Sequence, residues 1–468
     1  MSTLHSVSPP QDSRTALWVL CMSAFLVPFM GSALNLALPD ISEDFSLKAV
    51  TLTWMATAYM LSTAIFQIPF ARLGDLIGRK KVYIWGIVGF SACSFLSGLA
   101  VSGLMLILCR FLTGVCSAMM FGTNLAILSS LFPSEQRGKA LGINTSVVYA
   151  SLAIGPLLGG VLTHYSGWRS IFFVSGAVGF VVAGFARLFL KGEWTESKGE
   201  KFDFIGSSIY GIALTGVILG CTQLPKMSGY ALVFLGILAF MLFSYYEQKC
   251  LFPVFNVKLF SRNRVFALSS LSALINYAST SAIIFMLSLY LQYLRGYNAQ
   301  QAGFIIISQA SLMAIFALLS GRLSDRFAPA SIATAGMGMI VVGLIGLIFL
   351  TQSSSIYFII GILFLLGIGF GLFSSPNTNV IMSSVEKRYY GQASAVTGTM
   401  RQTGQALSMG IAGMAIALNM GNQKLIPEVY PQFLSSMKIT FVIFAGLCMV
   451  GVFASSYRGG MPPRPKTC

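Results

Sequence analysis

The chain has 468 residues, of which 55% are apolar and only 9% are charged, whereas about a quarter of the residues of an ordinary soluble domain are charged. Too few polar residues are present to cover a water-facing surface, which excludes a soluble monomer. The net charge is +16, but the basic residues form no stripe with interleaved aromatic residues, so we expect no nucleic-acid partner.

The apolar residues fall into separate blocks of about twenty, the length that a helix rising ~1.5 Å per residue needs to cross ~30 Å of hydrocarbon. Six blocks precede a charged connector at 191–203, two more precede a second connector at 247–264, and six follow it. The predicted spans are 16–39, 50–71, 82–101, 104–131, 138–163, 169–190, 204–223, 228–246, 265–293, 299–320, 329–351, 356–375, 391–419 and 434–456. The sequence therefore predicts an all-helical membrane protein with fourteen spans in the order six, two, six.

Lysine and arginine residues between the spans predict the orientation, since cytoplasmic loops carry the excess of positive charge. With a cytoplasmic amino terminus, the cytoplasmic segments hold twenty-two of these residues and the outer segments hold six, which leaves Arg110 and Arg401 within the membrane. The first fifteen residues are polar and lead into an apolar block without a small-residue cleavage signature, so we expect an uncleaved first span. We expect a multi-pass protein of the cell (inner, or cytoplasmic) membrane with both termini in the cytoplasm.

Two similar loops indicate an internal repeat. Residues 71–81 (ARLGDLIGRKK) connect spans two and three, and residues 321–326 (GRLSDR) lie between spans ten and eleven. If the central pair of spans is an insertion, these loops occupy equivalent places in two six-span halves, as in transporters that open a midplane cavity alternately to each side. The expected segments are a cytoplasmic tail at 1–15, an amino-terminal six-helix bundle at 16–190, connectors with an inserted transmembrane hairpin at 191–264, a carboxy-terminal six-helix bundle at 265–456 and a cytoplasmic tail at 457–468.

The loop at 71–81 resembles the cytoplasmic signature of the major facilitator superfamily, and the resemblance extends over nearly all of the chain. Further motifs in the same order are similar to its fourteen-span drug:proton antiporter branch. They are residues 35–39 (NLALP), Trp54 with 57–59 (TAY), 151–160, 202–206 (FDFIG) and 259–264. The resemblance implies a major facilitator fold, with two six-helix bundles and an inserted two-helix hairpin.

The resemblance also assigns the loop after span two to an interdomain latch that breaks and re-forms during transport. Asp75 can accept hydrogen bonds from backbone N–H groups at a neighbouring helix start, where the helix dipole favours an anion. Plain positive-inside topology explains the cations of this loop but not its glycines. Span five resembles the antiporter signature, a seam in which small residues let helices approach closely and Pro156 bends the helix, although generic helix packing also uses small residues. The candidate coupling or gating residues are Gly74, Asp75, Gly78, Arg79, Arg110, Gly155, Pro156, Gly159 and Asp325.

Arg110 and Arg401 are cations within predicted spans four and thirteen. A guanidinium inside the membrane is costly and needs a partner or a water-filled cavity. Arg110 shares one helix face with Gly114, Ser117 and Asn124, and it matches the fourth-span arginine of the family. It is therefore either a coupling residue or a structural hydrogen-bond hub. The candidate cavity residues are Asn35, Tyr59, Gln67, Arg110, Asn124, Asn276, Tyr277, Gln292, Gln309 and Arg401.

None of the fourteen acidic residues falls in the middle of a predicted span. Related exporters of cationic drugs commonly carry an acid in span one, and the resemblance places Met30 at the matching position. A buried carboxylate attracts a cation and titrates near neutral pH. Its absence favours neutral or anionic amphipaths as cargo and leaves proton coupling to rim acids such as Asp40 or Asp75.

These features together predict a secondary active transporter, not an enzyme, which exports amphipathic or hydrophobic compounds by alternating access in the manner of multidrug efflux, with protons as the expected coupling ion. The alternatives are an exporter or exchanger of organic anions or lipids that uses Arg110 and Arg401, and a non-transporting membrane receptor. The two histidines and eight cysteines form no metal-binding or redox motif, and the chain has no P-loop, so we expect no metal and no cofactor. We expect the protein to work as a monomer on a small amphipathic or lipid-like substrate in the lipid bilayer.

Overall fold

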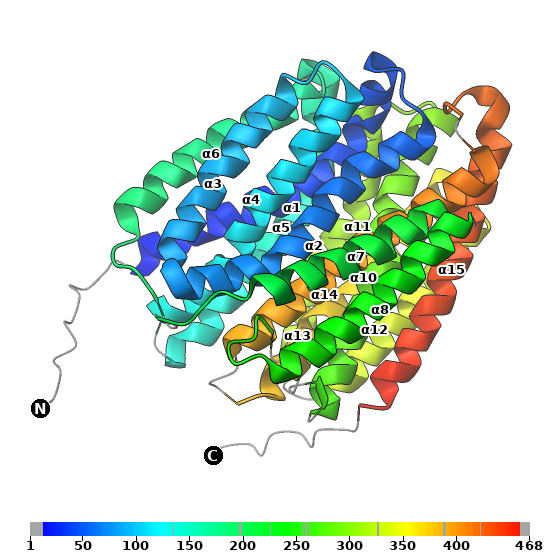
Figure 1. The fold of residues 1–468 in the computed structure, drawn as a ribbon. Coiled ribbons are helices and arrows are strands. Elements are labelled where there is room, and N and C mark those ends of the chain that lie inside the picture. The colour runs from blue at the N-terminus through cyan, green and yellow to red at the C-terminus, as the bar shows by residue number, and fades with distance from the viewer. Residues whose placement is uncertain are drawn as a thin grey trace, which may run out of the picture.

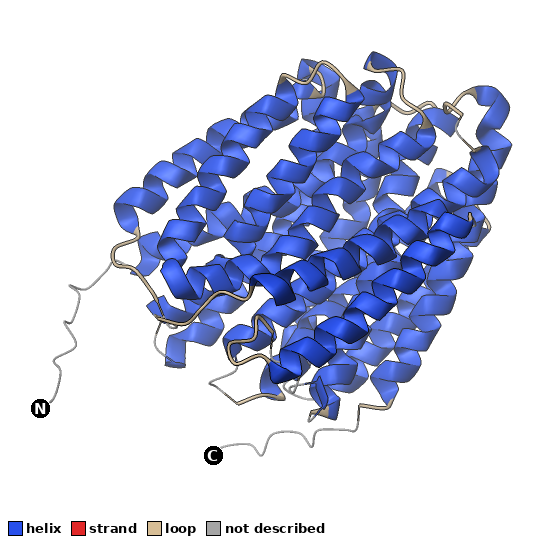
Figure 2. Cartoon of the chain, in the orientation of Figure 1, coloured by secondary structure: helices blue, strands red, loops and turns tan. Residues whose placement is uncertain are grey.

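The structure, a computed structural model, describes residues 13–132, 134–195, 199–224, 226–255, 257, 260–261, 263–324, 327–386, 390–421 and 423–458. In these ranges the regular structure is helical throughout (Figure 2). The long helices are α1 (Ser13–Asp44), α2 (Ala49–Ile77), α3 (Arg79–Gly98), α4 (Gly103–Leu131), α5 (Ser134–Ser166), α6 (Arg169–Phe189), α7 (Phe204–Gln223), α8 (Met227–Lys249), α10 (Arg264–Leu289), α11 (Ala299–Leu323), α12 (Pro329–Ile348), α13 (Ile356–Ser383), α14 (Tyr390–Met420) and α15 (Tyr430–Ser456). A π-helix, η1 (Tyr290–Leu294), follows α10, and a short 3-10 helix, η3 (Pro427–Val429), precedes α15. The prediction of an all-helical chain with fourteen long helices is confirmed.

Twelve of these helices are long and apolar enough, by length and composition, to cross a membrane. Among the described helices, α3 and α14 miss this criterion. Helix α3 opens with three cations in succession, and α14 contains Arg401 together with several glutamines. The polar residues of α14 must face protein or a cavity rather than lipid, because an unpaired charge in hydrocarbon is costly.

The helix boundaries follow local chemistry. The Ser102 hydroxyl accepts a hydrogen bond from the backbone N–H of Met105 at 3.2 Å, and the Asn263 side chain accepts one from the backbone N–H of Phe266 at 3.0 Å. These caps satisfy N–H groups that have no partner inside the first turn of α4 or α10. Gly78 separates α2 from α3 with a φ of +121°, a conformation that L side chains rarely adopt.

The two halves of the chain repeat one packing pattern. In the amino-terminal half, α1 packs on α5, α2 packs on α4, and α3 packs on both α4 and α6. In the carboxy-terminal half, α10 packs on α14, α11 packs on α13, and α12 packs on both α13 and α15. The halves meet where α5 contacts α11 and where α2 contacts α14. Since α2 corresponds to α11 and α5 to α14, these two contacts are also equivalent. This is the parallel repeat of two six-helix bundles that the two similar loops predict.

Helices α7 and α8 pack on each other as a hairpin, and α7 lies against α14 and α2 (Figure 1). A hairpin returns the chain to the side from which it started, so the insertion leaves the second half in the same orientation as the first. Because the number of long helices is even, α1 begins and α15 ends at the same end of the bundle (Figure 1). The tail residues 1–12 and 459–468, and the predicted gating residue Asp325, lie outside the described residues.

Candidate functional site

A cavity lies between the two halves, where α1, α2, α4 and α5 face α10, α11, α13 and α14. The space between the lining residues, including the part open to solvent, is about 960 Å³. Aromatic side chains from both halves form much of the wall. They are Tyr59, Phe121, Tyr277 and Phe370. The repeat therefore places one shared chamber at the centre of the molecule.

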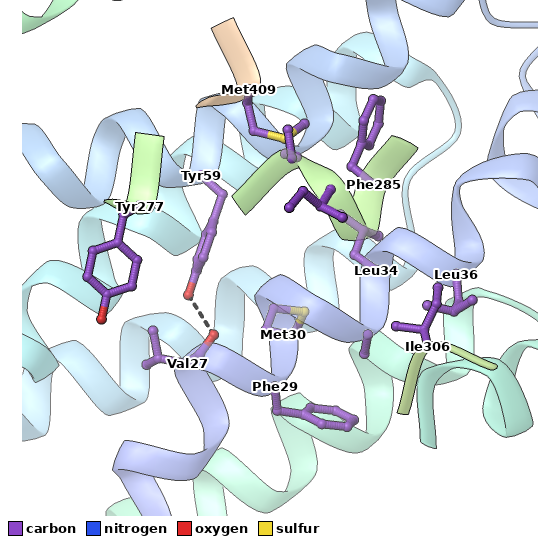
Figure 3. Close-up of a cluster of buried hydrophobic side chains, with 14 of the residues drawn as sticks. Val27, Phe29, Met30, Leu34, Leu36, Tyr59, Tyr277, Phe285, Ile306 and Met409 are labelled. Carbon is purple, nitrogen blue, oxygen red and sulfur yellow. Dashed lines mark hydrogen bonds between the residues drawn. The ribbon is translucent and has the colours of Figure 1, made fainter. Parts of the chain in front are cut away.

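Five of the ten predicted cavity residues line this chamber, each from a different helix. They are Asn35 of α1, Tyr59 of α2, Tyr277 of α10, Gln309 of α11 and Arg401 of α14. Figure 3 shows the Tyr59 hydroxyl pointing to the backbone of α1, where it donates a hydrogen bond to the carbonyl oxygen of Val27 at 3.0 Å. The wall of the chamber is thus fixed by contacts between neighbouring helices of the first half.

Arg401 supplies the one charged side chain among the described residues that line the chamber. Its guanidinium carbon lies 5.1 Å from the centre of the Phe121 ring, a cation–π contact that joins α14 of one half to α4 of the other. Gln402 and Gln405 also line the chamber and add amide groups beside the guanidinium. A cation, amides and aromatic walls together suit an amphipath with a flat apolar body and hydrogen-bond acceptors.

Arg110 lies behind the wall of the chamber rather than in it. Its side chain is 1% exposed, and its guanidinium carbon lies 4.2 Å from the centre of the Tyr59 ring. Its Nε donates a hydrogen bond to the carbonyl oxygen of Met55 at 3.3 Å, whereas its Nη1 has no hydrogen-bond partner. Arg110 therefore lies one layer behind the chamber wall, beside Tyr59.

The other predicted cavity residues also lie outside the lining. Asn124 and Gln292 each donate a hydrogen bond from the side-chain amide to a backbone carbonyl of α1, at 2.9 and 3.2 Å. They therefore join helices. Gln67 and Asn276 are buried, and neither the Gln67 Oε1 nor either polar side-chain atom of Asn276 has a hydrogen-bond partner.

The loop between α2 and α3 is bonded to its own half. Arg79 donates a hydrogen bond from Nε to Asp75 Oδ1 at 2.7 Å and another from Nη1 to the Ser130 hydroxyl at 2.9 Å. Gly74 packs so closely on α4 that a side-chain carbon there would lie 2.8 Å from a methyl group. The loop is therefore held against α4 by its predicted gating residues.

The predicted glycines of α5 make close contacts within the first half, while Pro156 faces the second. A side-chain carbon at Gly159 would lie 2.6 Å from the carbonyl oxygen of Ala33 in α1, and Gly155 packs on the same helix. On the adjacent face, a side-chain carbon at Gly303 of α11 would lie 2.8 Å from the carbonyl oxygen of Pro156. Helix α5 thus uses one face for its own bundle and the next face for the other bundle.

Contacts between the halves lie on both sides of the chamber along the helix axes. Toward the carboxyl end of α1, the Ser288 hydroxyl donates a hydrogen bond to the carbonyl oxygen of Asn35 at 2.6 Å. Toward the opposite end of the bundle, the Tyr149 hydroxyl contacts the Ser374 hydroxyl. The sequence did not predict Tyr149 or Phe121 as site residues. Phe121 lies on the same face of its helix as Arg110, Gly114 and Ser117, so a helical wheel could have identified it.

No acidic side chain is among the described residues that line the chamber. Met30, at the position where the resemblance expects an acid, is fully buried in the hydrophobic core and lies outside the lining (Figure 3). The fixed charges at the chamber are therefore the Arg401 guanidinium in its wall and the Arg110 guanidinium behind Tyr59. Both favour electron-rich or anionic groups.

The profile described as Major Facilitator Superfamily matches residues 20–409. The riboflavin transporter RibZ of Clostridioides difficile is 28% identical over 445 residues, which cover 94% of this chain and 96% of that protein. The multidrug resistance protein Stp of Mycobacterium tuberculosis and the cephamycin export protein CmcT of Amycolatopsis lactamdurans are each 30% identical over 414 residues. These alignments cover 86% of this chain and 76% and 85% of the two relatives.

A solved structure of a bacterial homologue of the human lysosomal transporter Spinster, in an inward-facing and occupied conformation, has a similar fold. The TM-score is 0.68 at 17% sequence identity, with 96% of this chain and 97% of that chain covered. At this identity the likeness shows the fold alone. The profile and the efflux proteins at 30% identity show that the chain belongs to the Major Facilitator Superfamily, as a secondary transporter of its fourteen-span drug-efflux branch.

Proposed function

We propose that this transporter exports amphipathic or hydrophobic compounds, neutral or anionic, by alternating access. The observation that carries the proposal is the central chamber, in which aromatic walls from both halves enclose one guanidinium and several amides, with no acid among the described lining residues. Apolar walls take up the body of an amphipath by burial, and the polar groups orient its acceptors.

The relatives support a small organic cargo of varied shape. Their names refer to riboflavin, cephamycin and tetracenomycin C. Met60 and Met313 line the chamber beside the aromatic residues, and flexible thioethers suit a surface that re-packs around different ligands. We therefore propose a multidrug type of selectivity rather than a tight fit to one compound.

An exporter or exchanger of organic anions is the second candidate. The position of Arg401 in the chamber wall favours it, because a guanidinium binds carboxylate or phosphate groups through paired, charge-assisted hydrogen bonds. In this variant Arg110 strengthens the positive potential from behind Tyr59, and lipids with anionic headgroups belong to the same class of cargo.

In the proposed cycle the two six-helix halves, 16–190 and 265–456, rock about the contacts of α5 with α11 and of α2 with α14. The Ser288–Asn35 contact and the Tyr149–Ser374 contact lie on opposite sides of the chamber, so opening one while the other stays closed would expose the chamber to one side at a time. The loop with Asp75 and Arg79 is proposed as the latch, and protons as the coupling ion.

We place both termini in the cytoplasm, on the strength of the positive charge in the loops. Alkaline phosphatase, which is active only outside the cytoplasm, tests this orientation. A fusion after Gln223, in the predicted outer loop between α7 and α8, should be active. A fusion after Leu190, in the predicted cytoplasmic connector that follows α6, should be inactive. The reverse pattern would contradict the proposed orientation.

Cargo and coupling are tested separately. A thermal-shift screen of the purified chain should show stabilisation by neutral and anionic amphipaths, and stabilisation by cationic compounds alone would contradict the proposed cargo. Uptake of a compound identified in that screen into inside-out vesicles should increase when the vesicle lumen is more acidic than the medium, because protons leaving the lumen drive the compound inward. Uptake that is indifferent to the pH gradient would exclude proton antiport while leaving export itself intact.

A further inference from the structure

A pair of buried carboxylates lies outside the central chamber, at the end of the inserted hairpin where α7 begins and α8 ends. Asp203 directly precedes α7, and Glu247 lies in the last turn of α8. Asp203 is 8% exposed and Glu247 is 3% exposed. Two carboxylates so far removed from water cannot both ionise at low cost unless each has a compensating partner.

The two carboxylates converge on one point above Gly206. A side-chain carbon at Gly206 would lie 2.6 Å from Glu247 Oε1 and even closer to Asp203 Oδ2. The absence of a side chain at this glycine therefore leaves room for both oxygens. Both oxygens therefore lie near the same point, and ionisation of both groups would place two like charges close together.

The hydrogen-bond partners of the two groups are unequal. Asp203 Oδ1 accepts from the backbone N–H of Gly206 at 2.8 Å and from the Tyr246 hydroxyl at 3.2 Å, and Asp203 Oδ2 accepts from the Cys250 thiol at 3.5 Å. Burial raises the pKa of the Cys250 thiol, so it stays a neutral donor. Glu247 Oε2 accepts from the backbone N–H of Phe255 at 3.3 Å, but Glu247 Oε1 has no hydrogen-bond partner.

The dipoles of the two helix ends also stabilise a negative charge on Asp203 better than one on Glu247. Asp203 caps the amino terminus of α7, where the helix dipole stabilises an anion, whereas Glu247 lies at the carboxyl end of α8, where the dipole destabilises one. Arg72 at the end of α2 is the cation whose charge acts on Glu247, and it already pairs with Glu200. Lys249 of α8 donates instead to the Tyr245 hydroxyl. The surroundings thus stabilise the neutral form of Glu247, whose Oε1 has no donor.

We propose that Asp203 and Glu247 form a proton-binding site of the inserted hairpin, in which Glu247 carries the proton on Oε1 at neutral pH and faces the Asp203 carboxyl group. Glu247 Oε1 accepts no hydrogen bond, and when it carries the proton it can donate one instead. Release of this proton creates a second buried anion, on which the positive charge of Arg72 acts, so the protonation state affects the contact between the hairpin and α2. The site needs no substrate, and its existence is independent of the proposed export function.

Infrared difference spectroscopy of the full-length purified chain tests this site, because a protonated carboxyl group has a C=O band that an ionised one lacks. The wild type should show such a band at neutral pH and lose it as the pH rises. Glu247→Gln should remove one carboxyl band, and the control Glu200→Gln should retain it. Wild-type and Glu247→Gln chains with the same carboxyl bands would overturn the proposal.

Asp203→Asn keeps the proposal testable if Glu247→Gln fails to fold. Without the neighbouring negative charge, Glu247 should release its proton at lower pH, so the midpoint of the band should shift down. A midpoint that does not move, or that shifts to higher pH, would overturn the assignment of the proton to Glu247. Thermal stability gives a second readout: the folded state holds a proton that the unfolded chain releases near pH ~4.3, so wild-type stability should fall with rising pH more steeply than that of Glu247→Gln.

Discussion

At the scale of single residues, the two intramembrane arginines have different surroundings and should have different roles. Arg401 lines the chamber and stacks on Phe121 of the other half, whereas Arg110 is covered by Tyr59. Both are cations of the same chemistry within long helices. Their neighbours, not their identity, decide which one can meet a cargo.

Arg401→Gln should weaken the binding of an anionic amphipath such as fluorescein by about ten- to a hundredfold. A hydrogen bond to a charged group contributes roughly 1.5–3 kcal/mol, and each 1.4 kcal/mol corresponds to a factor of ten in Kd. Ligand-dependent thermal shifts measure the change. Arg401→Lys, which keeps the charge but loses the planar stacking, is the matched control and should have an intermediate affinity. Unchanged affinity in Arg401→Gln would remove the guanidinium from the site.

Arg110→Leu should leave a folded protein that no longer transports efficiently. Replacing the guanidinium by an apolar side chain removes the hydrogen bond from Nε to Met55, but it also removes a buried cation whose Nη1 has no hydrogen-bond partner, and the two effects offset each other. Tyr59 loses its cation–π partner and is held less firmly in the chamber wall, so we expect transport to fall by about tenfold, which corresponds to roughly 1.4 kcal/mol in the barrier of the transport step. Size-exclusion profiles and vesicle uptake are measured on the same preparation. Loss of folded protein would instead identify Arg110 as a structural hub.

At the scale of helices, the close approach of α5 to α1 depends on glycines that have no room for a side chain. Gly159 lies directly on the backbone of α1, while Gly184 of α6 has nothing within 4 Å of its missing side chain. Small residues allow such approaches in membranes, where packing rather than hydrophobic burial joins helices. The same residue type therefore has a required role at one position and none at the other.

Gly159→Val should destabilise the folded chain by about 1–3 kcal/mol, because the added atoms overpack the α1–α5 contact. Gly184→Val is the matched control and should leave stability unchanged. Thermal unfolding in detergent, followed by the fluorescence of the native tryptophans, measures both variants. Equal melting temperatures for the two variants would show that α1 and α5 can separate without cost.

At the scale of the whole molecule, the halves are tied on both sides of the chamber, so a covalent link between them should stop the cycle. In a background without the native cysteines, Tyr149→Cys combined with Ser374→Cys places two thiols at a contact between α5 and α13. Oxidation should abolish transport, and a reductant should restore it. Vesicle uptake before and after oxidation measures the effect.

A link within one half provides the control for this experiment. The hydroxyls of Thr334 in α12 and Ser455 in α15 lie 2.6 Å apart, and both helices belong to the second half. A disulfide formed by Thr334→Cys with Ser455→Cys should leave transport active, because the half moves as one body. Transport that survives the link between the halves would contradict alternating access by rocking.

The number, order and kind of the helices follow from the sequence, because an apolar stretch of about twenty residues is a local property that the bilayer selects by length. Helix η1 shows the limit of this reasoning. The span predicted at 265–293 ends in a π-helical turn, which no periodicity in the sequence indicated. The two similar loops predicted the repeat because each loop lies between the same pair of helices in its half.

The sequence also located the two intramembrane guanidiniums and the absence of a mid-span acid, since both are properties of composition along the helices. The sequence could not show that Arg401 lines the chamber whereas Arg110 lies behind its wall. That distinction rests on contacts such as Arg401 with Phe121 and Tyr149 with Ser374, which join residues more than two hundred positions apart. Helical periodicity defines which residues share a face, but only the packing of two halves on each other determines which faces enclose a common space.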